Sequence, residues 1–143
     1  MTSFTDITIL HAWRFDDLFT EMEGMLHSVP GFEYRNFGLP WHDPAYQPST
    51  EEGLEYLRNR AEVQVLPAQV AIAIPELFAS DRGRQWAEIE LNVCATENKP
   101  VLVATKDPSK IPDWLATRAT KTVAWDASAV VAAVRRLAGH PVD

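Results

Sequence analysis

The sequence predicts an α/β fold in which a mainly parallel, five-stranded sheet lies between layers of helices. Two observations lead to this expectation. Short runs of β-branched and apolar residues alternate along the chain with segments of helical periodicity. Two of these runs, residues 69–74 (QVAIAI) and 100–105 (PVLVAT), are continuously apolar, as is typical of parallel strands covered on both faces. Alternating elements of this kind form doubly wound sandwiches.

The first half of the chain supplies two strands and two helices. Residues 6–11 are mostly β-branched or apolar, and residues 16–26 repeat apolar side chains at helical spacing after two acids that suit a helix N-terminus. Residues 32–37 alternate apolar and polar side chains, which predicts a strand with one wet face at a sheet edge. Three prolines in residues 38–48 predict a loop. Residues 49–61 begin with a Ser-Thr-Glu-Glu cap signal and continue as a helix.

The second half completes the alternation. Helical spacing covers residues 84–98, a short helix is expected near residues 112–119, and residues 121–125 read as the fifth strand. Residues 128–138 form a closing amphipathic helix. No linker or repeat interrupts the chain, so residues 1–143 are expected to be a single domain.

A doubly wound sheet also predicts where a ligand binds. Ligands lie outside the carboxyl ends of the strands, where the strand order reverses, which in the flavodoxin-like order is between the first and third strands. The segments that follow those two strands are residues 11–14 and 75–90. We therefore expect the functional site between these segments.

Composition excludes several classes of protein. The 143 residues carry a net charge of −7, and 46% of them are apolar. Residues 1–57 hold ten acids and two bases, whereas residues 58–143 hold ten acids and eleven bases. The basic residues form no clustered stripe, so nucleic-acid binding is not expected. No apolar run approaches 18 residues and no signal peptide is recognisable, so neither membrane insertion nor secretion is expected and a cytoplasmic location is the default.

Several familiar sites are also missing from the sequence. Neither a Gly-x-Gly-x-x-Gly fingerprint nor a Gly-Lys-Ser/Thr phosphate loop is present. A response-regulator receiver would need an acidic pair after the first strand, where His11-Ala12-Trp13 stands. The four histidines and Cys94 show no metal-ligand spacing, so no metal site is expected.

Glu90 is the acid whose position needs an explanation. On a helical projection of residues 84–98 it falls inside the broad apolar arc that contains Trp86 and Cys94, whereas Glu88 and Asn92 lie on the opposite side. Burying a carboxylate costs several kcal/mol unless it is paired or hydrogen-bonded. Two explanations stay open: a structural carboxylate that is bonded in the core, or an acid that serves a concave site.

Three tryptophans flank the expected crevice. Trp86 lies one helical turn before Glu90, Trp13 follows the first strand, and Trp41 lies in the proline-rich loop. Filling the core is the commoner use of such rings, but aromatic walls also suit a flat heterocycle such as nicotinamide or adenine.

Five segments, in this order and spacing, carry a resemblance to a known family. They are the first strand leading into His11-Ala12-Trp13, residues 32–40 (FEYRNFGLP), residues 86–90 (WAEIE), residues 99–103 (KPVLV), and residues 123–126 (VAWD) leading into residues 130–135 (VVAAVR). Through them the chain resembles the TIR-like proteins of Thoeris anti-phage defence, a divergent bacterial branch of the TIR superfamily.

The resemblance implies a flavodoxin-like, three-layer sandwich and an enzyme that cleaves the nicotinamide–ribose bond of NAD. NAD would be the substrate, and no cofactor is implied. In this family the Glu that lies four residues after a Trp on the third helix is catalytic, which corresponds to Glu90. An ionised carboxylate suits this chemistry because the positive charge of the nicotinamide ring in NAD passes to the ribose, as an oxocarbenium-like cation, when neutral nicotinamide leaves.

The resemblance also implies substrate-binding residues and partners. His11, Trp13 and Asn36 fall where family members line the pocket, and residues 37–44, beginning with Phe37, correspond to the loop that covers it. Trp86, one turn before Glu90, is a further expected substrate-binding residue. The ADP-ribose-derived product, possibly cyclic, would activate a separate effector protein, and the enzyme would form a homo-oligomer on activation.

The acidic first part of the chain should not steer an anionic dinucleotide. Phosphate contacts are therefore expected from a few donors such as Arg14 or Arg35, or from backbone amides. Two other functions remain open: a non-catalytic TIR-like adaptor that acts by self-association, and a nucleoside or nucleotide N-glycosidase or ribosyl transferase on a similar fold.

Overall fold

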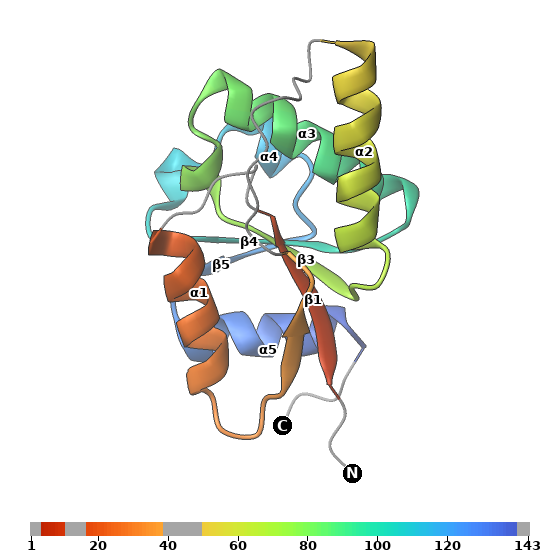
Figure 1. The fold of residues 1–143 in the computed structure, drawn as a ribbon. Helices are drawn as coiled ribbons and strands as arrows, with labels where there is room; N and C mark the ends of the chain where they lie inside the picture. The colour runs from red at the N-terminus through yellow and green to blue at the C-terminus, as the bar shows by residue number, and fades with distance from the viewer. Residues whose placement is uncertain (1–3, 11–16, 39–49, 140–143) are drawn as a thin grey trace.

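The computed structural model describes residues 4–10, 17–38 and 50–139 (Figure 1). Five strands form one sheet in the order β2-β1-β3-β4-β5, and all four pairings are parallel. This is the flavodoxin-like order, so the predicted fold class is confirmed. The strands are β1 (Thr5–Leu10), β2 (Tyr34–Asn36), β3 (Val70–Ala73), β4 (Val101–Thr105) and β5 (Lys121–Ala124).

Helices cover both faces of the sheet and make the fold a three-layer sandwich. On one face lie α1 and α5, and on the other lie α2, α3 and the short α4 (Figure 1). Their bounds are α1 (Asp17–Ser28), α2 (Glu51–Val65), α3 (Asp81–Thr96), α4 (Asp113–Ala116) and α5 (Ala127–Leu137). Two 3-10 helices, η1 (Pro75–Phe78) and η2 (Pro108–Lys110), follow β3 and β4.

The burial of each strand follows from its sequence pattern. Every residue of β3 and β4 is buried, in agreement with the two continuously apolar runs. At one edge, β2 alternates between half-buried Tyr34 and Asn36 and exposed Arg35, as the period-two pattern predicted. The strand is shorter than the predicted residues 32–37, because its register with β1 covers Tyr34, Arg35 and Asn36.

Capping side chains determine where α2 and α3 begin. The Thr50 hydroxyl accepts a hydrogen bond from the Gly53 N–H at 2.9 Å, which confirms the cap predicted for α2. The predicted start of the next helix at residue 84 was wrong, since α3 begins at Asp81. The Ser80 hydroxyl accepts from the Gly83 N–H at 3.0 Å and so satisfies an early amide of the helix.

A polar cluster joins α1 to the carboxyl ends of β4 and β5. The Glu21 carboxylate accepts hydrogen bonds from Trp125 Nε1 at 3.0 Å and from Lys106 Nζ at 3.2 Å. The Lys106 ammonium also lies 5.6 Å from the centre of the Trp125 ring. Hydrogen bonds from Trp125 and then from Lys106 lower the pKa of Glu21.

Two further observations concern the described part of the chain. None of its helices combines the length and the apolar character that crossing a membrane would require. Within residues 4–10, 17–38 and 50–139, no three His, Cys, Asp or Glu side chains gather closely enough to hold a metal ion. Most of the predicted loop at residues 38–48 lies outside these ranges.

Candidate functional site

The helix α3 carries Trp86 and Glu90 on its buried side. Trp86 is 1% exposed and Glu90 is 0% exposed, one helical turn apart. On the other side of the helix, Glu88 is half-buried and Asn92 is exposed to solvent. The placement of Glu90 inside the apolar arc is therefore confirmed, and the helix buries a carboxylate among core side chains.

Cys94, one turn after Glu90, reports the electrostatic character of this region. Burial, and after it the nearby Glu90 carboxylate, raises the pKa of the Cys94 thiol to about 12. A thiol with so high a pKa is not a nucleophile at neutral pH. Cys94 therefore acts as a small core residue, and Glu90 is the group in this stretch whose chemistry could serve a reaction.

Asn36 holds the carboxyl end of β2 against its neighbours. Its Oδ1 atom accepts hydrogen bonds from the Ile9 N–H at 3.1 Å and from the Gly38 N–H at 2.9 Å. Its Nδ2 atom donates to the Glu23 carboxylate at 3.2 Å. These three bonds give the predicted substrate-binding residue a structural role between β1, β2 and α1.

Gly38 is a residue of this region that the sequence reasoning did not single out. A Cβ atom at this position would lie 2.3 Å from the Ile9 carbonyl oxygen and 2.7 Å from the Ile9 nitrogen. Only glycine allows so close an approach of two backbone segments. The signal was present in the sequence, because Gly38 belongs to the segment Asn36-Phe37-Gly38 that carried part of the resemblance.

Arg35, one of the expected phosphate donors, is engaged by a carboxylate. Its Nε and Nη2 atoms donate to the two oxygens of Asp6 at 2.6 and 2.9 Å. The guanidinium also lies 5.3 Å from the centre of the Phe4 ring, and the Arg35 side chain is 57% exposed. The bond to Asp6 is the first cause of a raised pKa at Arg35. To bind a phosphate, Arg35 would have to exchange this bidentate partner.

The remaining predicted site residues divide into two groups. Phe37 is half-buried, and its N–H donates to the Ile7 carbonyl at 2.9 Å, which extends the contact between β1 and β2. His11, Trp13 and Arg14 lie outside the described residues, as do residues 39–44 of the expected covering loop. Their place in a pocket stays a prediction.

A cavity of about 450 Å³ opens at the carboxyl ends of β3 and β4. Its lining comes from η1, the first turn of α3 and the segment around α4: Pro75, Glu76, Phe78, Ala79, Ser80, Asp81, Arg84, Lys110, Pro112 and Trp114. The expected site segment, residues 75–90, contributes seven of these residues, but neither Trp86 nor Glu90 is among them. This cavity and the buried carboxylate are therefore distinct features of the same helix.

Aromatic and polar contacts shape that cavity. The rings of Phe78 and Trp114 meet edge to face with their centres 6.4 Å apart, and the Arg84 guanidinium lies 5.4 Å from the centre of the Trp114 ring. On the strand side, the Thr105 hydroxyl lies 3.2 Å from Glu76 Oε1, to which it donates. Sequence reasoning missed Thr105 and Trp114, because their contacts join the segments after β3 and β4 only in the folded chain.

Comparison with known proteins adds no relative to this description. Neither a family model nor a curated protein matches the sequence. The connection to TIR-like proteins therefore rests on the five motif segments, and it stays a prediction.

Proposed function

We propose that the chain is an NAD-cleaving, TIR-like enzyme in which Glu90 is the catalytic carboxylate. The observation that carries the proposal is the complete burial of Glu90 on α3, one turn after Trp86. Support also comes from the strand order β2-β1-β3-β4-β5, which is the flavodoxin-like order expected of the family that the motifs resemble.

The reaction needs little more than a well-placed negative charge. When the bond between ribose C1′ and the nicotinamide nitrogen breaks, its electron pair stays with nicotinamide, which leaves as a neutral molecule. The ribosyl group becomes an oxocarbenium-like cation, which the Glu90 carboxylate stabilises. Addition of water and loss of its proton gives ADP-ribose. A nucleophile from the same nucleotide, in a site that excludes water, would give a cyclic product instead.

The burial of Glu90 has a consequence for activation. A substrate cannot touch a carboxylate that is 0% exposed. We therefore expect catalysis to require a rearrangement that opens α3 to NAD, which fits an enzyme that assembles into a homo-oligomer on activation. Its product would then act as a signal for a separate effector in anti-phage defence.

Nicotinamide release from NAD by the purified chain tests this proposal. The assay is run alone and with lysate from phage-infected cells as the trigger. The variant Glu90→Gln should lower the rate at least about a hundredfold, because a neutral amide cannot stabilise the cation. Glu88→Gln is the matched control on the same helix, and it should leave the rate unchanged. Equal release by wild type and Glu90→Gln contradicts the assigned role.

A substrate panel separates the proposed reaction from a related one. Deoxynucleosides and nucleotides are compared with NAD under the same conditions. Cleavage of deoxynucleosides in preference to NAD would indicate the alternative N-glycosidase or ribosyl transferase.

A second candidate function is a non-catalytic TIR-like adaptor. The observation that favours it is again the 0% exposure of Glu90, which suits a carboxylate that serves only the fold. An adaptor would self-associate without consuming NAD. Light scattering with the trigger, beside the nicotinamide assay, distinguishes assembly alone from assembly with catalysis.

A further inference from the structure

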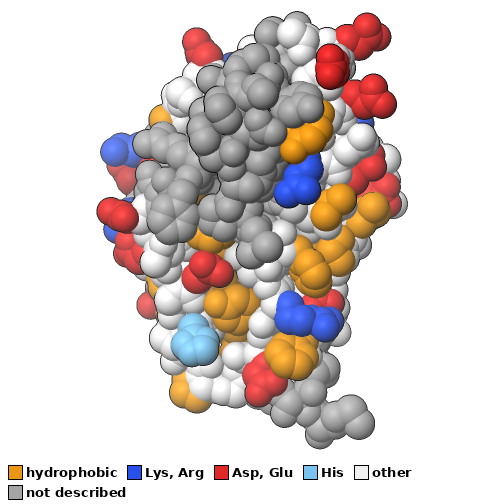
Figure 2. Space-filling model, in the orientation of Figure 1, with side chains coloured by type: hydrophobic (Ala, Val, Ile, Leu, Met, Phe, Trp, Pro, Cys, Tyr) orange, Lys and Arg blue, Asp and Glu red, His pale blue; other side chains and the backbone are white. Residues whose placement is uncertain are grey.

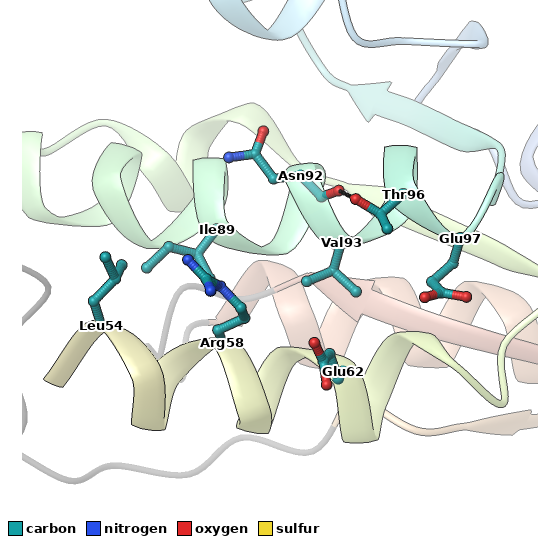
Figure 3. A pocket seen from close by; sticks show the side chains of 8 residues that line it. All are labelled: Leu54, Arg58, Glu62, Ile89, Asn92, Val93, Thr96 and Glu97. Carbon is teal, nitrogen blue, oxygen red and sulfur yellow. Dashed lines mark hydrogen bonds between the residues drawn. The ribbon is translucent and has the colours of Figure 1, made fainter. Parts of the chain in front are cut away.

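The outer surface of α2 and α3 contains a groove whose lining does not include Glu90. It has a volume of about 460 Å³ and lies between the two helices, which run side by side (Figure 3). Three apolar side chains form its floor: Leu54 from α2, and Ile89 and Val93 from α3. Ile89 is 9% exposed and Val93 is 6% exposed, so the floor is continuous with the hydrophobic core.

The length of the groove corresponds to two turns of helix. It extends from Leu54 to Glu62 along α2 and from Ile89 to Glu97 along α3. At the rise of an α-helix, either stretch spans about 12 Å. An amphipathic helix would place two or three apolar side chains on a floor of this length, at the i, i+3 or i+4, i+7 spacing.

One end of the groove is strongly negative. Glu62 and Glu97 line it where α2 and α3 finish, and neither helix has a basic residue in its last turn. The partial negative charges of the two helix C-termini add to the two carboxylates. Among the described residues that line the groove, Arg58 is the one cation. A partner that complements this end must bring Lys or Arg side chains.

The charge continues over the outer side of α2. Glu51 and Glu55 line a second hollow beside Leu54 and Arg58. The large apolar side chain of Leu66, just after α2, is 48% exposed. Figure 2 shows acidic and hydrophobic side chains along α2, on the right of the view. Glu51 and Glu55 thus extend the negative charge beside the apolar floor of the groove.

We propose that this groove is the docking site for a basic amphipathic helix of a partner protein. The apolar face of that helix packs on Leu54, Ile89 and Val93. Its Lys or Arg side chains pair with Glu62 and Glu97, where a cation also offsets the two helix dipoles. The proposal is independent of NAD cleavage, because docking is measured as binding.

A designed peptide tests the site directly. The probe is a labelled helical peptide of about 14 residues, with Leu at the i, i+3, i+4 and i+7 positions and Lys elsewhere, and its binding to the full chain is followed by fluorescence anisotropy. The double variant Glu62→Lys/Glu97→Lys should weaken binding at least about tenfold. The matched control, Glu33→Lys/Glu52→Lys, changes the net charge equally at exposed positions away from the groove and should bind like wild type.

Four outcomes would overturn the proposal. The first is no saturable binding up to about 1 mM peptide. The second is an equal loss of affinity in both double variants. The third is equal binding of a peptide that has the same composition but scrambled spacing. Either result would mean that net charge alone attracts the probe. The fourth is a wild-type dimer that Glu62→Lys/Glu97→Lys dissociates, which would identify the occupant as a second copy of this chain. Thermal unfolding of each variant verifies that it is folded.

Discussion

Two parts of the expected site behave differently in the structure: the end of β2 around Asn36 and the buried side of α3 around Glu90. Both lie in segments that carry the resemblance to TIR-like proteins. At the end of β2, the fold itself accounts for two residue types. Asn36 makes three hydrogen bonds, and Gly38 allows a close approach to the backbone of Ile9. On α3, the Glu90 carboxylate is buried in the core, where desolvation of a charged group lowers the stability of the folded state. The structure thus explains Asn36 and Gly38 by their contacts, whereas the proposed reaction gives Glu90 its role.

The largest loss of stability is expected at Gly38. Substitution by Ala would put a Cβ atom against backbone atoms of Ile9, which belong to β1 and cannot move independently of the sheet. We expect Gly38→Ala to lower the free energy of unfolding by about 3 kcal/mol or more, measured by urea denaturation.

Gly24 is the matched control for that prediction. It lies within α1, and a Cβ atom there would meet nothing within 4 Å. Gly24→Ala should raise the free energy of unfolding by about 0.5–1 kcal/mol. A mild effect at both positions would mean that the close approach to Ile9 does not constrain the strand pair.

A smaller loss is expected at Asn36. Asn36→Ala leaves the N–H groups of Ile9 and Gly38 without their acceptor, which should cost about 2 kcal/mol in urea denaturation. Asn36→Asp keeps the acceptor oxygen for both N–H groups but replaces the donated bond by repulsion from the Glu23 carboxylate, so it should also be less stable than wild type. If Asn36→Ala is as stable as wild type, these bonds do not explain the residue.

Cys94 tests the electrostatic description of α3. It is the single cysteine of the chain, so thiol chemistry reports on it alone. With its pKa raised to about 12, the native thiol should react with a thiol reagent at pH 8 at least about a hundredfold more slowly than in urea. A native rate similar to the rate in urea would show that this side of α3 is open to solvent.

The same raised pKa predicts how stability depends on pH. The folded state favours the neutral thiol, so the stabilisation is fully present below the ordinary thiol pKa of 9.0 and is lost as the pH rises toward 12. Stability curves of wild type and Cys94→Ala across this range should converge as the pH increases. Parallel curves would contradict the shift.

The smallest effect is expected at Glu21, on the exposed surface. Glu21→Gln weakens the bonds to Trp125 and Lys106 and should lower Tm slightly at pH 7. Because the pKa of Glu21 is lowered in the folded state, its stabilisation is present above the ordinary value of 4.5 and is lost as the pH falls. The difference in Tm should therefore disappear in acid, and a difference that persists there would exclude the ionised carboxylate as its cause.

Much of this fold could be predicted from the sequence because the patterns are local. The apolar runs that became β3 and β4, and the alternation around Tyr34 and Arg35, depend only on which faces are buried. The start of α3 was placed three residues late because the cap depends on a single hydroxyl, that of Ser80.

The candidate site was less predictable, because it depends on contacts between distant segments. Periodicity placed Glu90 inside the core, yet no pattern shows that Asn36 bonds to Glu23 or that Arg35 bonds to Asp6. The cavity beside Trp114 brings together two segments, one that follows β3 and one that follows β4. Such features appear only once the chain has folded.

Nicotinamide release by Glu90→Gln tests most directly whether this carboxylate serves the reaction. Gln keeps the shape of the side chain and removes the charge that would stabilise the ribosyl cation. The proposed enzyme predicts that the variant, verified as folded by thermal unfolding, releases nicotinamide at least about a hundredfold more slowly than wild type. Release by the folded variant at the wild-type rate would contradict the proposal.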